Sequence, residues 1–225
     1  MLPARRNDIS RLEAFSDAAF AFALTLLVVS LEVPRSYDDL MRTMRGLPSF
    51  ACCFALLVWI WHEHNLFFRR YGLQDGVTVV LNGILMFVVL FYVYPLKFMF
   101  DSMFAQFTAD PALTQMTLPQ LSRASAIYGL GFFVLVLIFT LLYRHAYRRR
   151  DELKLTPAEA FDVNAFALHH LSSAGVGLAS MAFALLAPAR VAFVAPMLFG
   201  LMGPLHWWLG NHNERKRRVV LAPER

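Results

Sequence analysis

Long apolar stretches follow one another along the chain, separated by short segments that carry most of the charged residues. An α-helix rises about 1.5 Å per residue, so about 20 apolar residues are needed to cross a hydrocarbon layer about 30 Å thick. Six stretches of that length predict six transmembrane helices, at 13–33, 48–67, 76–99, 125–144, 163–187 and 190–210. The pattern therefore predicts an all-α, polytopic membrane protein. Pro188 and Arg190 interrupt the apolar pattern between the last two helices and predict a tight hairpin there.

Composition supports this fold class and excludes several functions. Hydrophobic residues make up 58% of the 225 residues and charged residues only 16%, whereas soluble domains carry about 25% charged residues. Cys52 and Cys53 are neighbours within an apolar stretch, so they predict neither a disulfide framework nor a cysteine metal cluster. The catalytic patterns G-x-S-x-G and H-E-x-x-H do not occur, and an enzyme ranks last among the functions considered.

The positive charges are distributed unevenly between the two sides of the predicted bundle. Of the 21 Lys and Arg residues, 15 lie on the side that holds both termini and 6 on the other side. The positive-inside rule therefore places both termini in the cytoplasm. The expected organisation is a cytoplasmic N-terminal segment (1–12), one transmembrane domain (13–210) and a basic cytoplasmic tail (211–225). The basic clusters flank apolar segments, which indicates contact with anionic lipids and not with nucleic acid.

Polar residues inside the predicted spans are costly in lipid and are therefore informative. Because successive spans run in opposite directions, polar residues of the first three spans fall at a similar depth. We expect these residues to form one hydrogen-bonded network: Arg11, Ser16, Asp17, Trp61, His62 or His64, and Asn82. A structural clasp between helices is the favoured interpretation, and a gate, a proton-sensing site or an ion-binding site stays open.

Two further patterns concern helix faces. Phe22, Thr25, Leu26 and Val29 share one face of the first span. That face suits contact with lipid or another helix, and it would equally permit a pore, since apolar rings gate by dewetting and hydroxyls replace part of an ion's water shell. A run of small residues at 172–180 indicates close helix packing in the fifth span.

No metal or cofactor site is predicted. The run 62–64, His-Glu-His, lacks a pair of ligands four residues apart on a helix. His169 and His170 are adjacent and point to different faces, so we expect them to be interfacial or packing residues.

The first span carries a motif that composition does not explain. The spacing of Arg11, Phe15, Ser16 and Asp17 resembles the RxxxFSD signature of the transmembrane-protein-175 family, the endolysosomal potassium channels and their bacterial homologues. The pairs Trp61-His62 and Leu81-Asn82 support the resemblance, which covers roughly the first 100 residues.

This resemblance implies a six-helix subunit and, for bacterial members, a homotetramer whose first helices line a potassium-permeable pore without a TVGYG filter. It also implies a polar network in which Arg11, Ser16 and Asp17 join Trp61 and His62. The family's pore constriction is usually an isoleucine five residues after the aspartate, and here that position holds Phe22. The constriction therefore consists of Phe22 or lies deeper, at Leu26 or Val29.

Our leading hypothesis is a homotetrameric, potassium-preferring channel of a bacterial plasma membrane, with potassium ions and membrane lipids as its partners. Ions would pass down their gradient through a pore lined by Phe22, Thr25, Leu26 and Val29. The alternative is a proton- or ion-coupled secondary transporter that uses Asp17 and His62 or His64 as titrating groups.

Overall fold

A computed structural model describes residues 8–31, 33–108, 117–191 and 194–220. Long helices dominate it: α1 (Arg11–Val29), α3 (Leu47–Tyr71), α4 (Gly76–Thr108), α6 (Leu118–Arg148), α7 (Pro157–Leu186) and α9 (Met202–Val220). Shorter elements join them: α2 (Tyr37–Arg45), η1 (Ala189–Val191), α8 (Val194–Met197) and η2 (Leu198–Leu201). The predicted all-helical fold is confirmed.

The helix ends follow from local sequence. Ser10 caps α1, and its side chain and that of Glu13 each accept a hydrogen bond from the other residue's backbone. Thr156 and Glu159 form the same arrangement at the start of α7. At the end of α3, Gly72 adopts a left-handed conformation with φ of 58°, which costs glycine little. These signals start α1 two residues and α7 six residues before the predicted spans, and end α3 four residues after its predicted span.

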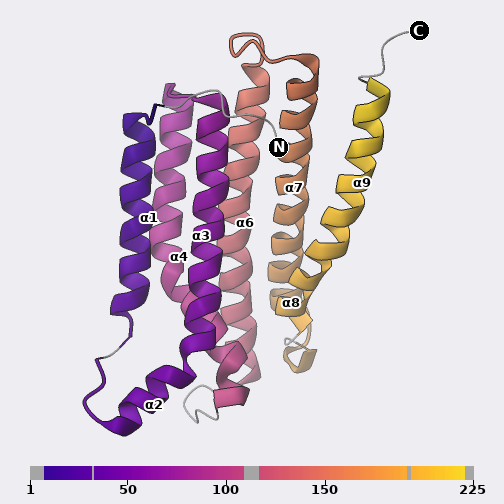
Figure 1. The fold of residues 1–225 in the computed structure, drawn as a ribbon. Coiled ribbons are helices and arrows are strands. Elements are labelled where there is room, and N and C mark those ends of the chain that lie inside the picture. Colours follow the sequence, from indigo (N-terminus) through magenta and orange to yellow (C-terminus); the bar gives the residue numbers. More distant parts are fainter. Residues whose placement is uncertain (1–7, 32, 109–116, 192–193, 221–225) are drawn as a thin grey trace.

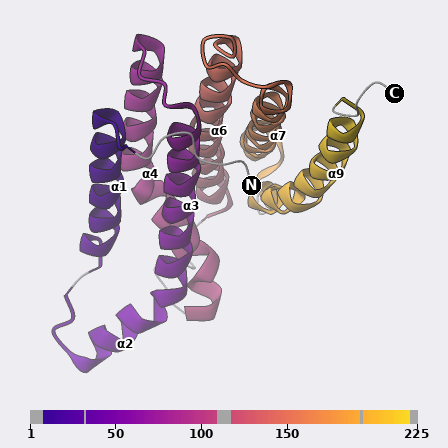
Figure 2. The ribbon, with the colours of Figure 1, turned by 45° about the horizontal axis from the view of Figure 1, so that its top comes forward.

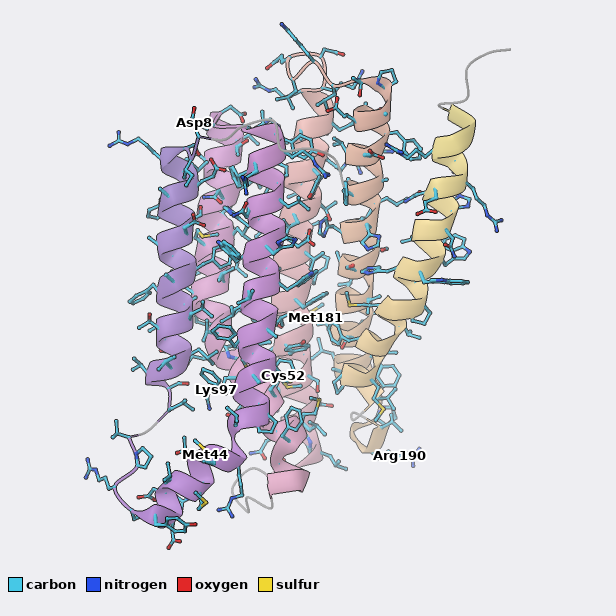
Figure 3. The ribbon with its side chains drawn as sticks, viewed as in Figure 1. Asp8, Met44, Cys52, Lys97, Met181 and Arg190 are labelled. Carbon is cyan, nitrogen blue, oxygen red and sulfur yellow. The ribbon has the colours of Figure 1, made fainter. Side chains whose placement is uncertain are left out.

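Five helices are long and apolar enough to cross a membrane: Arg11–Val29, Leu47–Tyr71, Gly76–Ala105, Leu118–Arg148 and Pro157–Leu186. They correspond to the first five predicted spans. The helices run alternately up and down, and α1 begins at the same end of the molecule at which α9 finishes (Figure 1). Figure 3 places Asp8 at that end and Arg190 at the opposite end.

The predicted sixth span, 190–210, is not one continuous helix. It is divided among η1, α8, η2 and the first half of α9. Pro188, Pro196, Gly200, Gly203 and Pro204 explain the division, since proline lacks a backbone donor and glycine favours the unfolded chain. The second half of α9 is polar, and α9 continues through the predicted domain boundary at 210 without a break.

The helices pack in a row of neighbours. Helix α1 contacts α3 and α4, α4 contacts α6, α6 contacts α7, and α7 contacts α9. Figures 1 and 2 accordingly show α1 and α9 at opposite edges of the bundle. The central apolar core includes Phe67, Leu85, Leu135 and Tyr143. Helix α1 is therefore buried on one face only.

Candidate functional site

Three buried side chains connect α1, α3 and α4. Asn82 of α4 donates from Nδ2 to Oγ of Ser16 at 2.9 Å. Nε2 of His64 on α3 lies 2.8 Å from Oδ1 of Asn82. All three side chains are buried, and His64 is only 1% exposed. Since a buried polar group is costly unless it is hydrogen-bonded, these contacts hold the three helices together.

The direction of these bonds follows from the serine. The Ser16 hydroxyl donates to the backbone carbonyl of Leu12 at 2.9 Å. A hydroxyl has one proton, so Ser16 must accept from the Asn82 amide. The amide oxygen then faces His64, and an oxygen without a proton can only accept. His64 therefore carries a proton on Nε2 and donates it to Asn82.

A second link between α1 and α3 lies at the edge of the same site. The indole Nε1 of Trp61 donates to Oδ1 of Asp17 at 2.8 Å. A charged acceptor makes this bond stronger than a neutral one. Asp17 is half-buried and Trp61 is 36% exposed. The carboxylate that the sequence places inside the first span thus has a partner on a neighbouring helix.

The structure does not bring every expected residue into this network. Arg11 and His62 are exposed, and neither side chain hydrogen-bonds to any of the residues that the structure describes. His64, and not His62, is the histidine that contacts Asn82. His62 and His64 are two residues apart, so their side chains point about 200° apart around α3, at about 100° per residue. Only one of the two can therefore face α4.

A cavity of about 180 Å³ opens beside the network, at the end of the bundle where α1 begins. Its lining joins three carboxylates to basic and polar groups: Asp8, Ile9, Glu13, Asp17, His64, Asn65 and Arg69. Sequence analysis missed this cavity, because its residues come from two helices and the segment before α1. Within the described residues, no cluster of three or more His, Cys, Asp or Glu has the arrangement of a metal site.

The predicted pore residues occupy the face of α1 that none of the other helices in the described part of the chain covers. Phe22 is 56% exposed and Val29 is 71% exposed. Thr25 is also exposed, whereas Leu26 is half-buried. The opposite face is buried against α3 and α4 and consists of Ser16, Phe20, Ala23 and Leu27.

The hydrogen bond that the Thr25 side chain makes determines how its oxygen can interact with other groups. Its hydroxyl donates to the backbone carbonyl of Ala21 at 2.9 Å. Since that bond uses the only hydroxyl proton, the oxygen lone pairs are left to accept from, or coordinate, a group outside the helix.

Two other polar contacts involve α7, one with the first half of the chain and one with α9. Oε2 of Glu63 on α3 lies 3.7 Å from Nε2 of His170 on α7. His170 is buried and stacks on Tyr143 and Phe139, so the expectation of an interfacial or packing residue is met by packing. Arg217 of α9 forms a two-bonded ion pair with Asp162 of α7, at 3.0 and 3.2 Å.

A further contact lies in the turn between α3 and α4. Asp75 accepts hydrogen bonds from Thr78 and, at 2.8 Å, from His145 at the end of α6, and Arg149 lies 3.6 Å away. Burial alone would raise the pKa of Asp75. The hydrogen bonds from Thr78 and His145, with the positive charges of His145 and Arg149, outweigh burial and lower the pKa below its usual value.

Comparison with known proteins identifies the family of the chain. The family model described as the endosomal/lysosomal potassium channel TMEM175 matches residues 11–92, which span the helices of the polar network. A potassium channel of Marivirga tractuosa is 37% identical over 228 residues, covering 96% of this chain and 92% of the relative. A potassium channel of Chamaesiphon minutus is 25% identical over 207 residues, covering 87% of this chain and 95% of the relative.

Solved structures give the same result. The crystal structure of a variant of the potassium channel MtTMEM175, in complex with a nanobody fusion protein, superposes with a TM-score of 0.84 at 35% identity, covering 95% of this chain and 97% of that one. A lysosomal potassium-selective channel TMEM175 homologue from Chamaesiphon minutus shares the fold, with a TM-score of 0.57 at 22% identity, over 90% of this chain and 96% of that one. The chain is a multi-pass membrane protein and belongs to the TMEM175 family, whose matched members are named as channels and not as enzymes.

Proposed function

We propose that four copies of this chain form a potassium-permeable channel in a bacterial plasma membrane, with α1 of each copy lining a central pore. The observation that carries the proposal is the uncovered face of α1, which holds Phe22, Thr25 and Val29 while the opposite face is buried. Closed rotational symmetry brings identical faces of four subunits to one axis. The names of the relatives, which are potassium channels, support potassium as the permeant ion.

The pore residues have distinct roles in this proposal. Four Phe22 rings form the apolar constriction, which controls conduction by excluding water. Four Thr25 hydroxyls, each donating to its own backbone, present oxygen atoms to a dehydrating cation below that ring. Leu26 and Val29 continue the apolar wall. The Ser16–Asn82–His64 contacts and the Asp17–Trp61 bond hold α1 in place and do not touch the ion.

The topology is part of the proposal. We assign both termini to the cytoplasm, because the topology expected from the sequence puts 15 of the 21 basic residues on the same side as the termini. We assign the sixth membrane crossing to α8, η2 and the apolar first half of α9, where the exposed Trp207 and Trp208 suit the membrane interface.

The test is single-channel recording in a planar bilayer with potassium on one side and sodium on the other. We expect discrete current steps that reverse near the potassium equilibrium potential. Phe22→Ala should raise the unitary conductance several-fold, because the constriction widens. Phe87→Ala on α4 is the matched control, since Phe87 is a phenylalanine that is 69% exposed and far along the chain from α1. Equal effects of the two variants would contradict the pore assignment.

The selectivity assignment has its own test. Thr25→Val keeps the shape of the side chain but removes the oxygen, so the potassium-to-sodium permeability ratio should fall, while Thr25→Ser should preserve it. If verified oligomers of the native chain and of Phe22→Ala carry no current steps but take up ions in a pH-dependent way that Asp17→Asn abolishes, the chain is a coupled transporter.

A further inference from the structure

Helix α2 has no role in the proposed pore, and it is strongly two-sided. Its apolar side chains recur at the spacing of one helix face: Tyr37, Leu40, Met41 and Met44. The opposite face carries the polar side chains: Asp38, Asp39, Arg42, Thr43 and Arg45. No residue of α2 is buried, and Tyr37, Leu40 and Met44 are 72%, 40% and 48% exposed. Among the residues that the structure describes, none covers this apolar face.

The position of α2 suggests what covers it. The helix runs across the bundle axis instead of along it, at the end opposite the start of α1 and the end of α9 (Figures 1 and 2). Figure 3 places Met44 on this helix, clear of the long helices. It lies between the end of α1 at Val29 and the start of α3 at Leu47. Because α1 and α3 are membrane spans, a helix just beyond their ends and across their direction lies at the depth of the lipid headgroups.

Flanking residues extend the apolar face toward the spans. Val33 before α2 is 84% exposed, and Leu47 at the start of α3 is 55% exposed. The apolar face of α2 is thus flanked on both sides by exposed apolar side chains, one before the helix and one at the start of α3.

The charges of α2 fit a lipid surface with balanced charge. Asp38 and Asp39 lie in the first turn and Arg42 and Arg45 in the last turn, where each sign is favoured by the helix dipole. Arg42 lies 3.7 Å from Asp39. The four charges sum to zero, so the helix has no excess charge of the kind that recruits anionic lipid, and its polar face matches headgroups that carry both signs.

We propose that α2 is an interfacial helix whose apolar side chains insert at the boundary between the headgroups and the acyl chains, in the leaflet opposite the termini. A second copy of the chain is a weaker occupant. Nine residues span about 13 Å, which is too short for the roughly 800 Å² per partner that specific protein interfaces bury. The proposal rests on the membrane spans and is independent of whether the chain conducts ions.

The test measures the depth of single side chains. Cysteines are introduced at Leu40 or Asp38 in a background in which Cys52 and Cys53 are alanine, labelled with a nitroxide and reconstituted in phosphatidylcholine vesicles. Collision rates with oxygen, which concentrates in lipid, and with a water-soluble nickel chelate are measured by electron paramagnetic resonance. The oxygen-to-nickel ratio should be several-fold higher for Leu40→Cys than for Asp38→Cys.

A second pair guards against a local disturbance: Met44→Cys should behave as Leu40→Cys does, and Arg42→Cys as Asp38→Cys does. Labelled protein must elute as the same oligomer as the unlabelled chain. Free access of nickel to all four positions would place α2 in water and overturn the proposal. Protection of positions 40 and 44 from both reagents would identify a protein occupant, and would overturn it equally.

Discussion

The two halves of the bundle are joined by different means. In the first half, α1, α3 and α4 are linked by buried side-chain hydrogen bonds among Ser16, His64 and Asn82. In the second half, α6 and α7 approach so closely at two glycines that there is no room for side chains. A Cβ on Gly129 would lie 2.9 Å from the Met181 nitrogen, and one on Gly177 would lie 3.1 Å from the Phe133 nitrogen.

This contrast shows two solutions to one problem. Lipid tails are as apolar as leucine, so helices in a membrane gain little from hiding apolar surface and need another reason to associate. The first half uses polar bonds that are costly to break, which orients α1 while leaving its outer face uncovered. The second half uses close backbone packing between α6 and α7, and α6 in turn packs against α4. We expect the two halves to respond differently to small substitutions.

The largest effect is expected at the centre of the polar network. Asn82→Leu leaves the Nε2 proton of His64 buried without an acceptor, and an unsatisfied buried group costs about 1–3 kcal/mol. The free energy of unfolding should therefore fall by up to about 3 kcal/mol, measured by SDS titration of the protein in detergent. His64→Phe combined with Asn82→Leu should recover much of the loss, because both partners are then apolar. A double variant as unstable as the sum of the two single variants would contradict the assignment.

The next effect tests the glycine packing. Gly129→Ala should lower the free energy of unfolding by about 2 kcal/mol, because overpacking forces the backbones of α6 and α7 apart. Gly175→Ala is the control on α7, since a Cβ there meets nothing within 4 Å. That variant should be neutral or slightly stabilising, because alanine favours a helix over glycine. Similar losses in the two variants, in the same SDS titration, would show that the close approach is not what matters.

Substitution of two buried tyrosines should change stability by smaller amounts, and the two positions should differ. The Tyr92 hydroxyl donates to the backbone carbonyl of Tyr128 at 2.6 Å, so Tyr92→Phe should cost about 1 kcal/mol. The Tyr143 hydroxyl is buried and has no hydrogen-bond partner among the described residues. Tyr143→Phe should therefore leave stability unchanged or raise it. Thermal unfolding in detergent distinguishes the two, and a lower midpoint for Tyr143→Phe would reveal a partner.

The smallest effect concerns the bond that connects the halves at the turn before α4. Asp75 has a lowered pKa in the folded protein, so its contribution is present above its unfolded pKa of about 3.8 and is lost as the pH falls through the folded value. Because the contact is partly solvated, Asp75→Asn should cost at most about 1 kcal/mol at pH 7. Below the folded pKa of Asp75, the native chain and the variant should converge. A difference that persists in acid would assign the effect to shape and not to charge.

Hydropathy located the first five spans, because burial in lipid leaves a long continuous signal, although α4 and α6 extend beyond the predicted limits. It predicted the sixth span wrongly as one helix, since average hydropathy over 190–210 hides Pro196, Gly200 and Pro204. Helix α2 was missed for the opposite reason. It is short and half polar, so no apolar stretch reveals it.

The expected depth of each residue in the membrane predicted which residues would meet, but not the direction in which each side chain points. Ser16, Asp17, Trp61 and Asn82 were placed together from depth alone. The choice between His62 and His64 depends on the rotation of α3 about its axis, which only the packed structure supplies. The Glu63–His170 contact joins helices separated by more than 100 residues and had no local signal.

The bond between Ser16 and Asn82 has one more consequence, for the angular phase of α1. With about 100° per residue, fixing Ser16 toward α4 places Thr25 on the opposite side of the helix, nine residues later. An insertion of a single residue between Asp17 and Phe22 would keep this bond but advance everything after it by that angle, and Leu24 would take the direction that Thr25 now has. The number of residues between Ser16 and Thr25 therefore fixes the direction of Thr25 as firmly as the Ser16–Asn82 bond does. An insertion or deletion there would change that direction, whereas a loop can absorb one.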